Sequence, residues 1–237
     1  MKKWFLFSGA LCLTASVQAT SPIRFQPAVL NAAQLFNHDP SVGPVKHSLQ
    51  WIRNSTGELL AMTDVWYDRS GCFTRINMAD KLNDAEFHIV NQHGVLTSNR
   101  GQPVSGKVNQ RCQVTELENK SGKYRLSYNA QGLLESIIDR VSGKVSQRFE
   151  YRFGQFPVRI RDYEKQTDSR FFYPAGNPQF VDMETSLTAG KDTVWLKQSC
   201  SYQKDGNVAL CSQITANDAD YRDAVSVTFS NHKMENY

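Results

Sequence analysis

Short apolar and polar runs alternate along most of the chain, and turn-forming residues separate them. In the stretch 124–178, glycine turn signals recur about every eleven positions, at Gly132, Gly143 and Gly154. The runs between these turns are rich in aromatic and β-branched residues, as in Val145–Phe153. This pattern is typical of antiparallel strands of about seven or eight residues joined by tight turns.

The same pattern predicts further strands on both sides of this stretch. They are expected at Val45–Arg53, Leu59–Tyr67, Cys72–Asn77, Phe87–Val90, Gly94–Thr97, Arg111–Leu117 and Ala224–Phe229. Residues 77–86 are expected to form a loop or one helical turn, and residues 98–106 a loop. Pro27–Phe36 favours two turns of helix that begin near Pro27. We therefore predict an all-β fold, an antiparallel β-meander of about a dozen short strands forming one curved sheet or open barrel, with little helix.

An aromatic residue precedes several of the turn glycines by four positions. Tyr128 stands in this relation to Gly132, and Tyr202 to Gly206. In such a degenerate hairpin repeat, the aromatic ring is expected to pack on the sheet beside the turn. The glycine is expected to adopt the positive φ that the turn needs.

The N-terminus has the three parts of a secretory signal peptide. Lys2 and Lys3 supply positive charge, Trp4–Leu13 is apolar, and small residues precede a cleavage site after Ala19. An apolar run of about ten residues is too short for a spanning helix, so no transmembrane segment is expected. The predicted organisation is a cleaved signal peptide (1–19), an N-terminal tether (20–38) and a single all-β domain (39–237).

Net charge gives little indication of a partner. Cleavage would leave 237 − 19 = 218 residues and lower the formal charge from +4 to +2, because Lys2 and Lys3 would be removed. The chain also has no Lys/Arg-rich run, so no nucleic-acid partner is expected.

Four cysteines remain after the predicted cleavage, and an even number in an exported chain favours two disulfides. If Asp205 and Gly206 form a two-residue turn, Cys200 lies opposite Cys211, whereas a three-residue loop would shift this register by one. We predict the pair Cys200–Cys211 and, by elimination, Cys72–Cys112. A metal site is the alternative, but the chain has no C-x-x-C pair, so no metal or other cofactor is expected.

A search for catalytic motifs finds no nucleophile elbow, H-E-x-x-H motif or phosphate loop. His38 beside Asp39, with His47 nearby, is the nearest approach to a metal or acid–base cluster, but no further group that would converge on them is evident. The carboxylate pairs Asp162/Glu164 and Asp182/Glu184 are interpreted as surface groups. No catalytic residue is predicted.

The strongest candidate for binding is one face of the central strands. In Val145–Phe153 and the following strand, apolar side chains alternate with charged ones, which places several arginines on the face opposite the core. The predicted binding residues are Arg148, Arg152, Arg159 and Arg161. We expect this face to bind an anionic envelope partner, either lipid head groups or a protein, although nearby carboxylates make a simple solvated face the alternative.

Five short motifs are spread along the chain: Asp39-Pro-x-x-Gly-Pro-Val-Lys46, Gly71-Cys-Phe73, Cys112-Gln-x-x-Glu-Leu117, Lys197-Gln-Ser-Cys-x-Tyr202 and Cys211-x-Gln213. They are collinear over nearly the whole mature chain and include its four cysteines. These motifs resemble those of the YnfC-like family, a group of enterobacterial envelope lipoproteins of unknown function. The resemblance implies an envelope location and a lipid anchor.

The sequence departs from this family at the anchor itself. The family's attachment motif resembles Leu-Thr-Gly-Cys, but Ser16 stands here where the acylated cysteine would be, and a hydroxyl cannot form the thioether. Cys12 is the substitute, although the bulky Leu11 precedes it. A periplasmic protein cut after Ala19 is therefore the favoured prediction, with a membrane form anchored through Cys12 as the alternative.

Taken with the missing motifs, these features favour a non-enzymatic, exported protein of the cell envelope with a binding or structural role. The alternative is a hydrolase whose site is assembled from residues far apart in the sequence.

Overall fold

The computed structural model describes residues 25–81, 84–152, 155–174 and 181–237. The predicted signal peptide, with Cys12, and the predicted turn at Gly154 lie outside these residues. Within them the chain forms one helix, α1 (Pro27–Leu35), and sixteen strands. The strands are β1 (Val45–Asn54), β2 (Leu59–Tyr67), β3 (Phe73–Asp80), β4 (Ala85–Gln92), β5 (Val95–Gly101), β6 (Val104–Val108), β7 (Val114–Asn119), β8 (Gly122–Tyr128), β9 (Leu134–Asp139), β10 (Val145–Arg152), β11 (Phe156–Asp162), β12 (Thr167–Phe172), β13 (Met183–Ala189), β14 (Asp192–Tyr202), β15 (Val208–Ala216) and β16 (Ala224–Asn236).

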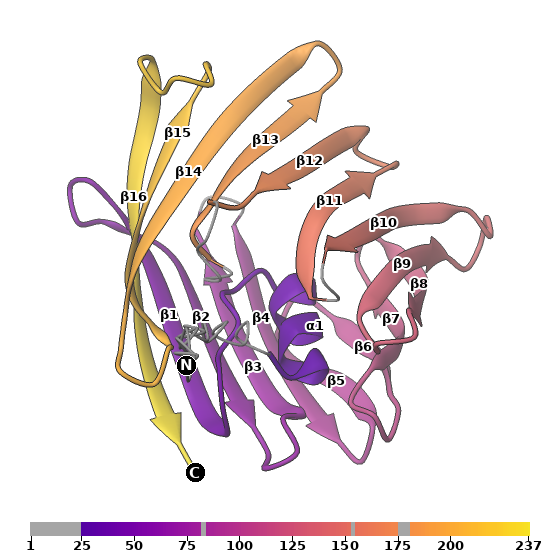
Figure 1. The fold of residues 1–237 in the computed structure, drawn as a ribbon. Helices are drawn as coiled ribbons and strands as arrows, with labels where there is room; N and C mark the ends of the chain where they lie inside the picture. Colours follow the sequence, from indigo (N-terminus) through magenta and orange to yellow (C-terminus); the bar gives the residue numbers. More distant parts are fainter. Residues whose placement is uncertain (1–24, 82–83, 153–154, 175–180) are drawn as a thin grey trace, which may run out of the picture.

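The strands form a closed antiparallel barrel (Figure 1). Each strand pairs with its neighbours in the sequence, and β1 also pairs with β16, from Val45 opposite Asn236 to Asn54 opposite Thr228. Closure leaves no unpaired sheet edge in this ring of strands. The predicted all-β antiparallel meander with little helix is therefore confirmed, and the sheet closes fully.

Strand structure is more extensive than predicted between residues 77 and 108. β3 continues to Asp80, and β5 and β6 occupy most of the segment that was expected to be a loop. Their inward positions hold buried Ile76, Leu96 and Val104, whereas the outward positions are mostly polar. Because half of each strand faces outward, its average hydrophobicity is low, and the prediction of loops there was wrong.

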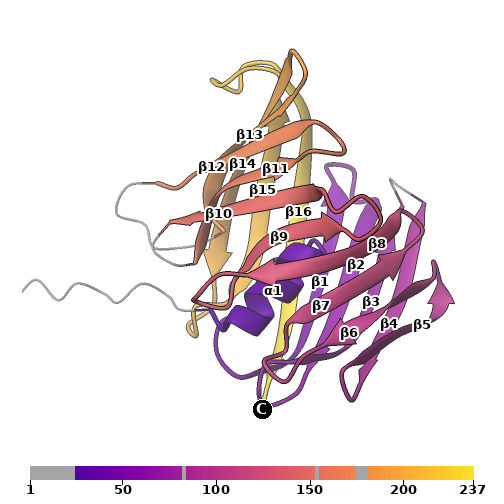
Figure 2. The same cartoon turned by 90° about the vertical axis from the view of Figure 1, so that its right-hand side faces the viewer.

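Helix α1 lies inside the barrel in both views (Figures 1 and 2). The walls of a sixteen-stranded barrel are too far apart for their own side chains to fill the lumen. The helix supplies volume there, and Val29, Leu30 and Ala32 are at most 2% exposed. α1 has nine residues, and no helix in the described part of the chain is long and apolar enough to cross a membrane.

Asn31 attaches this helix to the wall. Its Oδ1 accepts a hydrogen bond from the backbone N–H of Leu134, and its Nδ2 donates to the carbonyl oxygen of Gly132, both at 2.9 Å. The helix expected between Pro27 and Phe36 is thus confirmed. Its burial shows that the folded unit includes residues from Phe25 onward.

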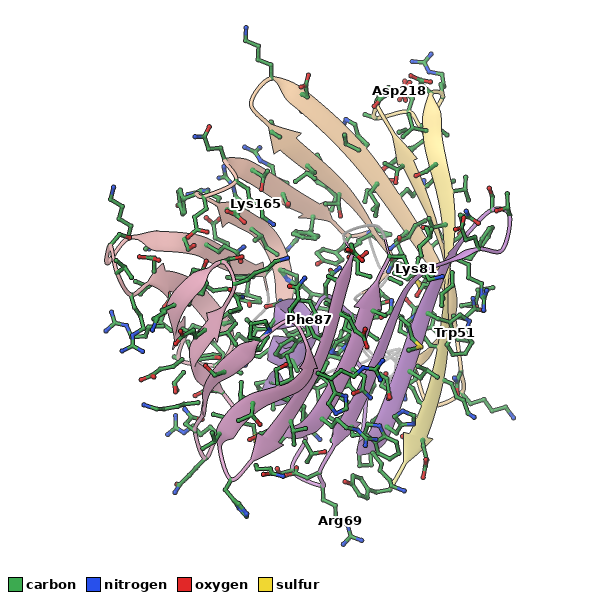
Figure 3. All side chains as sticks on the ribbon, turned by 180° about the vertical axis from the view of Figure 1, so that it is seen from behind. Trp51, Arg69, Lys81, Phe87, Lys165 and Asp218 are labelled. Carbon is green, nitrogen blue, oxygen red and sulfur yellow. A yellow bond between two sulfur atoms is a disulfide. The ribbon has the colours of Figure 1, made fainter. Side chains whose placement is uncertain are left out.

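The hydrophobic core lies within the lumen, and charged side chains occupy much of the outer wall. On β10, Phe149 and Tyr151 pack in the core, whereas Arg148 and Glu150 face outward. Figure 3 shows that Trp51 lies on the outer side of the wall. The alternation of apolar and charged side chains that was predicted for the strand beginning at Val145 is therefore present on β10.

The turn glycines adopt the conformation that the sequence predicts. φ is +80° at Gly132 and +85° at Gly206, a region in which a residue with a Cβ is strained. In the turn before Gly132, the side chain of Asn129 accepts hydrogen bonds from the backbone N–H groups of Gln131 and Leu133. Its short polar side chain therefore satisfies donors that the turn leaves unpaired.

Both predicted disulfides are present, Cys72–Cys112 and Cys200–Cys211. Cys200 lies opposite Cys211 as expected, but the turn between them is longer than two residues, because the N–H of Gln203 bonds to the carbonyl of Asn207. A register shift between Ser201 and Tyr202 compensates for the longer turn. The cysteine pairing was therefore predicted correctly, although the observed turn is longer than the two-residue turn from which it was predicted.

Candidate functional site

The barrel lumen holds a cavity of about 400 Å³ on the side of α1 that faces β11 to β15. α1 and the residues after it line one side, β11 to β15 line the other, and Gln50 and Ile52 of β1 complete the lining. Residues from seven elements therefore meet at this site. No sequence motif indicated it.

Much of the lining is apolar and comes from alternate positions of the strands. Thr185 of β13 lies opposite Leu196 of β14, and both line the cavity. The next pair, Glu184 and Lys197, forms an ion pair with an N–O distance of 3.1 Å. Other apolar lining residues are Leu30, Ile52, Ile160, Phe171 and Met183.

Glutamines form part of the polar lining. Gln213 Nε2 donates to Gln198 Oε1, and Gln198 Nε2 donates to the carbonyl of Val181 at 3.0 Å. Gln213 Oε1 accepts a hydrogen bond from Thr228 at 3.2 Å. These amides therefore have partners in the wall, which keeps their burial from costing free energy. Glutamines at inward positions of mixed polar and apolar strands were the available sequence signal for this site.

A buried polar network lies beside the cavity. Gln50 Nε2 donates to Asp39 Oδ2 at 3.1 Å and to Ser230 Oγ at 2.9 Å, and Gln50 Oε1 accepts the N–H of Asp39 at 2.8 Å. His232 Nε2 lies 3.1 Å from Asp39 Oδ2 and 2.9 Å from Ser230 Oγ. The network therefore joins the segment after α1 to β1 and β16.

Ser230, His232 and Asp39 are the residue types of a hydrolytic triad, but their geometry differs from one. In a triad, one ring nitrogen contacts the serine and the other contacts the carboxylate. Here Nε2 of His232 makes both contacts, while Nδ1 is buried without a partner among the described residues. Ser230 is also only 1% exposed. In this arrangement His232 cannot transfer a proton from Ser230 while Asp39 orients the ring.

The same region contains a grouping of metal-ligand types. Donor atoms of Asp39, Cys211 and His232 lie within 4.8 Å of one another. However, Cys211 is bonded to Cys200, and a disulfide sulfur is not the thiolate that binds a metal. The grouping therefore does not amount to a metal site while the disulfide is intact.

The histidines that the sequence suggested as a cluster do not converge. His38 is buried and lines the cavity, and burial lowers the pKa of its imidazole. His47 instead bonds to Asp64 and stacks on Trp66, with ring centroids 4.1 Å apart. Asp39 is joined by His232, which is distant in the sequence.

The two carboxylate pairs have structural partners. Asp162 is buried and accepts a hydrogen bond from Gln147 Nε2 at 2.8 Å. Asp182 accepts the N–H of Cys200 at 2.6 Å and the hydroxyl of Tyr202 at 3.0 Å. The interpretation of both pairs as surface groups was therefore wrong for Asp162, which faces inward.

The four predicted arginines lie together on β10 and β11. Arg148 is directly opposite Arg161, and Arg159 lies opposite Glu150. Arg159 makes two hydrogen bonds to Asp168, at 2.7 and 2.6 Å, and this contact lowers the pKa of the Asp168 carboxyl. Arg161 pairs with Glu150 at 3.0 Å. Carboxylates thus offset part of this positive charge, and the binding role of Arg148, Arg152, Arg159 and Arg161 stays a prediction.

Comparison with known proteins assigns the chain to a family. The sequence profile of an uncharacterised protein family, UPF0257, matches residues 1–237. The chain belongs to this family. It is also 22% identical over 210 residues to the UPF0257 lipoprotein YnfC of Escherichia coli O81 (strain ED1a) and of Escherichia coli O157:H7, with 86% of each chain covered.

A solved structure shares the fold. A porin-like protein from Bacteroides uniformis ATCC 8492 superposes with a TM-score of 0.55 at 14% sequence identity. The match covers 83% of this UPF0257 chain and 99% of the other chain. At this identity the similarity concerns the barrel architecture alone.

Proposed function

We propose that this UPF0257 protein is a non-enzymatic binding protein of the bacterial cell envelope that holds a small, largely apolar molecule in its barrel lumen. The observation that carries the proposal is the cavity of about 400 Å³ beside α1. Sites for small molecules typically measure about 300–1,000 Å³ and combine apolar walls with a few placed polar groups. The cavity beside α1 has both properties.

An envelope location is supported by three independent features. The curated relatives in Escherichia coli are named lipoproteins. The N-terminal sequence has the pattern of a signal peptide, and two disulfides fit an oxidising compartment. We favour a periplasmic form, with a lipid anchor at Cys12 as the alternative. Intact-mass spectrometry of protein purified from its native envelope distinguishes the two, because acylation adds mass at Cys12.

The non-enzymatic part of the proposal is supported by the network at Asp39. Ser230 and Asp39 both contact the same ring nitrogen of His232. The residues that most resemble hydrolytic machinery therefore form a buried hydrogen-bond network without the geometry of a triad. Turnover of an ester substrate that is lost in Ser230→Ala would overturn this part.

The binding part is tested with N-phenyl-1-naphthylamine, a neutral apolar dye whose fluorescence rises in apolar surroundings. We expect saturable binding of about one dye per protein, because the cavity accepts one molecule of this size. Leu196→Trp or Met183→Trp should reduce binding strongly by filling the cavity, while Ser201→Trp, on the exposed side of β14, should not.

Circular dichroism and a thermal melt confirm that each variant is folded. Two cavity-filling variants are used so that the test still stands if one of them does not fold. Absence of saturable dye binding by the wild-type protein would refute lumen binding. Equal binding by folded Leu196→Trp, Met183→Trp and Ser201→Trp would place the dye elsewhere and would refute it as well.

A further inference from the structure

We propose that the lumen cavity selects a neutral amphiphile, an apolar chain that carries an uncharged head group able to both donate and accept hydrogen bonds, such as a hydroxyl. This inference rests on the lumen-binding function proposed above and names the chemical class of the ligand. Two features of the lining carry it: the polar atoms that lack partners, and the sign of the charge.

Three polar atoms on lining residues are covered and have no hydrogen-bond partner in the described part of the chain. They are the end of the Gln34 amide that does not contact Tyr151, Nε2 of His38 and Oγ1 of Thr185. Covered polar groups without partners are uncommon in folded proteins and destabilise them, so each needs an explanation. The neighbouring amides of Gln198 and Gln213 do have partners in the wall, which makes these three atoms stand out.

The existing hydrogen bonds fix what two of these atoms offer. The hydroxyl of Tyr151 lies 2.7 Å from the side-chain amide of Gln34 and 2.7 Å from the carbonyl oxygen of Leu134. The carbonyl can only accept, so it takes the single hydroxyl proton. The Gln34 amide then donates to the hydroxyl oxygen, and its own oxygen is left as an acceptor. His38 Nδ1 lies 3.0 Å from the carbonyl oxygen of Asp39, which only accepts, so Nδ1 carries the proton. Burial lowers the pKa of His38 and keeps the ring neutral, so its Nε2 is an acceptor.

The lining therefore offers at least one donor and one acceptor beside apolar walls. Gln34 is in the last turn of α1, His38 follows the helix, and Thr185 lies across the cavity on β13. A hydroxyl group complements this set because it accepts from the Thr185 hydroxyl and donates to the His38 imidazole nitrogen or to the Gln34 amide oxygen. Since the three atoms are covered in this structure, binding involves small side-chain rotations, which are common at binding sites.

Charge excludes acidic ligands. No lysine or arginine is among the described residues that line the cavity, and Asp39 is the carboxylate among them. A fatty acid or a phosphate head group would therefore be buried near a like charge with no cation to pair with it, which is strongly unfavourable. Asp39 would attract an ammonium head group, but its Oδ2 already contacts Gln50 and His232, so burying an ammonium beside it gains little net free energy.

The test compares three amphiphiles that share one ten-carbon chain: decan-1-ol, decanoate and decylamine. Each competes with N-phenyl-1-naphthylamine for the wild-type protein at about pH 7.5, where the acid and the amine are charged. All are used below the concentrations at which they aggregate. We expect decan-1-ol to bind at least about ten-fold more tightly than either charged compound. An unpaired buried carboxylate is costly, and a buried ammonium gains little from a carboxylate that is already hydrogen-bonded.

Two variants test the head-group contacts. Thr185→Val and Gln34→Met each remove one polar group with little change in volume, and each should weaken decan-1-ol binding by about 3–10-fold, the usual effect of one hydrogen bond. Dye binding should stay within about two-fold, since the dye needs mainly the apolar walls. Thr188→Val is the matched control, because Thr188 lies on the same strand but outside the cavity lining.

The outcomes separate this inference from the function on which it rests. If the dye binds in the lumen but decanoate or decylamine competes as well as decan-1-ol, the neutral-ligand inference is wrong and lumen binding stands. If decan-1-ol affinity is unchanged in both folded variants, Thr185 and Gln34 do not hydrogen-bond to the head group, and the inference also fails. Failure of the dye to bind the wild-type protein refutes the proposed function itself.

Discussion

Asn31 is one of the buried side chains that attach α1 to the barrel, and its removal gives a prediction with a defined magnitude. Asn31 is 2% exposed and bonds to both Leu134 and Gly132. In Asn31→Ala the N–H of Leu134, a residue with 0% exposure, loses its partner. An orphaned buried donor of this kind costs about 1–3 kcal/mol.

The second lost bond costs less. The carbonyl of Gly132 keeps a hydrogen bond from Gln113 Nε2 at 3.3 Å, so the loss there is about 0.5–1.5 kcal/mol. Alanine is the better helix former and returns about 0.6 kcal/mol. The net expectation is a decrease of about 2 kcal/mol in the free energy of unfolding. For a domain of this size, that lowers Tm by about 4–8 °C.

The assay is thermal unfolding followed by circular dichroism under oxidising conditions, so that both disulfides remain intact. The matched control is Asn217→Ala, which makes the same chemical change at an exposed position and should move Tm by less than about 1 °C. If Asn31→Ala melts within about 1 °C of the wild type, the two Asn31 hydrogen bonds do not hold the helix as described, and this account of its attachment is refuted.

Two further predictions concern pH and charge. Burial lowers the pKa of His38 below its ordinary value of 6.5, so the unfolded chain binds a proton there that the folded chain does not. His38 should therefore make the folded state less stable as pH falls below about 6.5, by at most about 1.4 kcal/mol per pH unit. In denaturant unfolding between about pH 7.5 and 5.5, the stability of His38→Gln should depend less on pH than that of the wild type. An identical pH dependence contradicts the assignment of this effect to His38. On the outer wall, Arg159→Glu combined with Arg161→Glu should abolish binding to anionic vesicles at low salt, whereas the same reversals at exposed Lys107 and Lys123 should not. Equal vesicle binding by both double variants would show that the predicted arginine face has no special role.

Much of the architecture follows from local sequence patterns. Turn glycines such as Gly132, together with the period-two alternation of Val145–Phe153, predicted antiparallel hairpins. These signals are local because side chains alternate across every strand and because positive φ favours glycine. The pair Cys200–Cys211 was predictable for the same reason, since the two residues flank a single turn.

The tertiary structure alone decided where the ends of the sheet meet, where α1 lies and where the cavity forms. Nothing near Val45 indicates that its strand pairs with β16, since strand pairing between distant segments depends on the curvature accumulated over the whole sheet. α1 is short and could have lain anywhere on the surface. It lies in the lumen because a barrel of this width needs additional apolar volume inside. The cavity exists because the helix fills one side of the lumen more fully than the other. Its lining brings together residues as distant in sequence as Gln34 and Thr185.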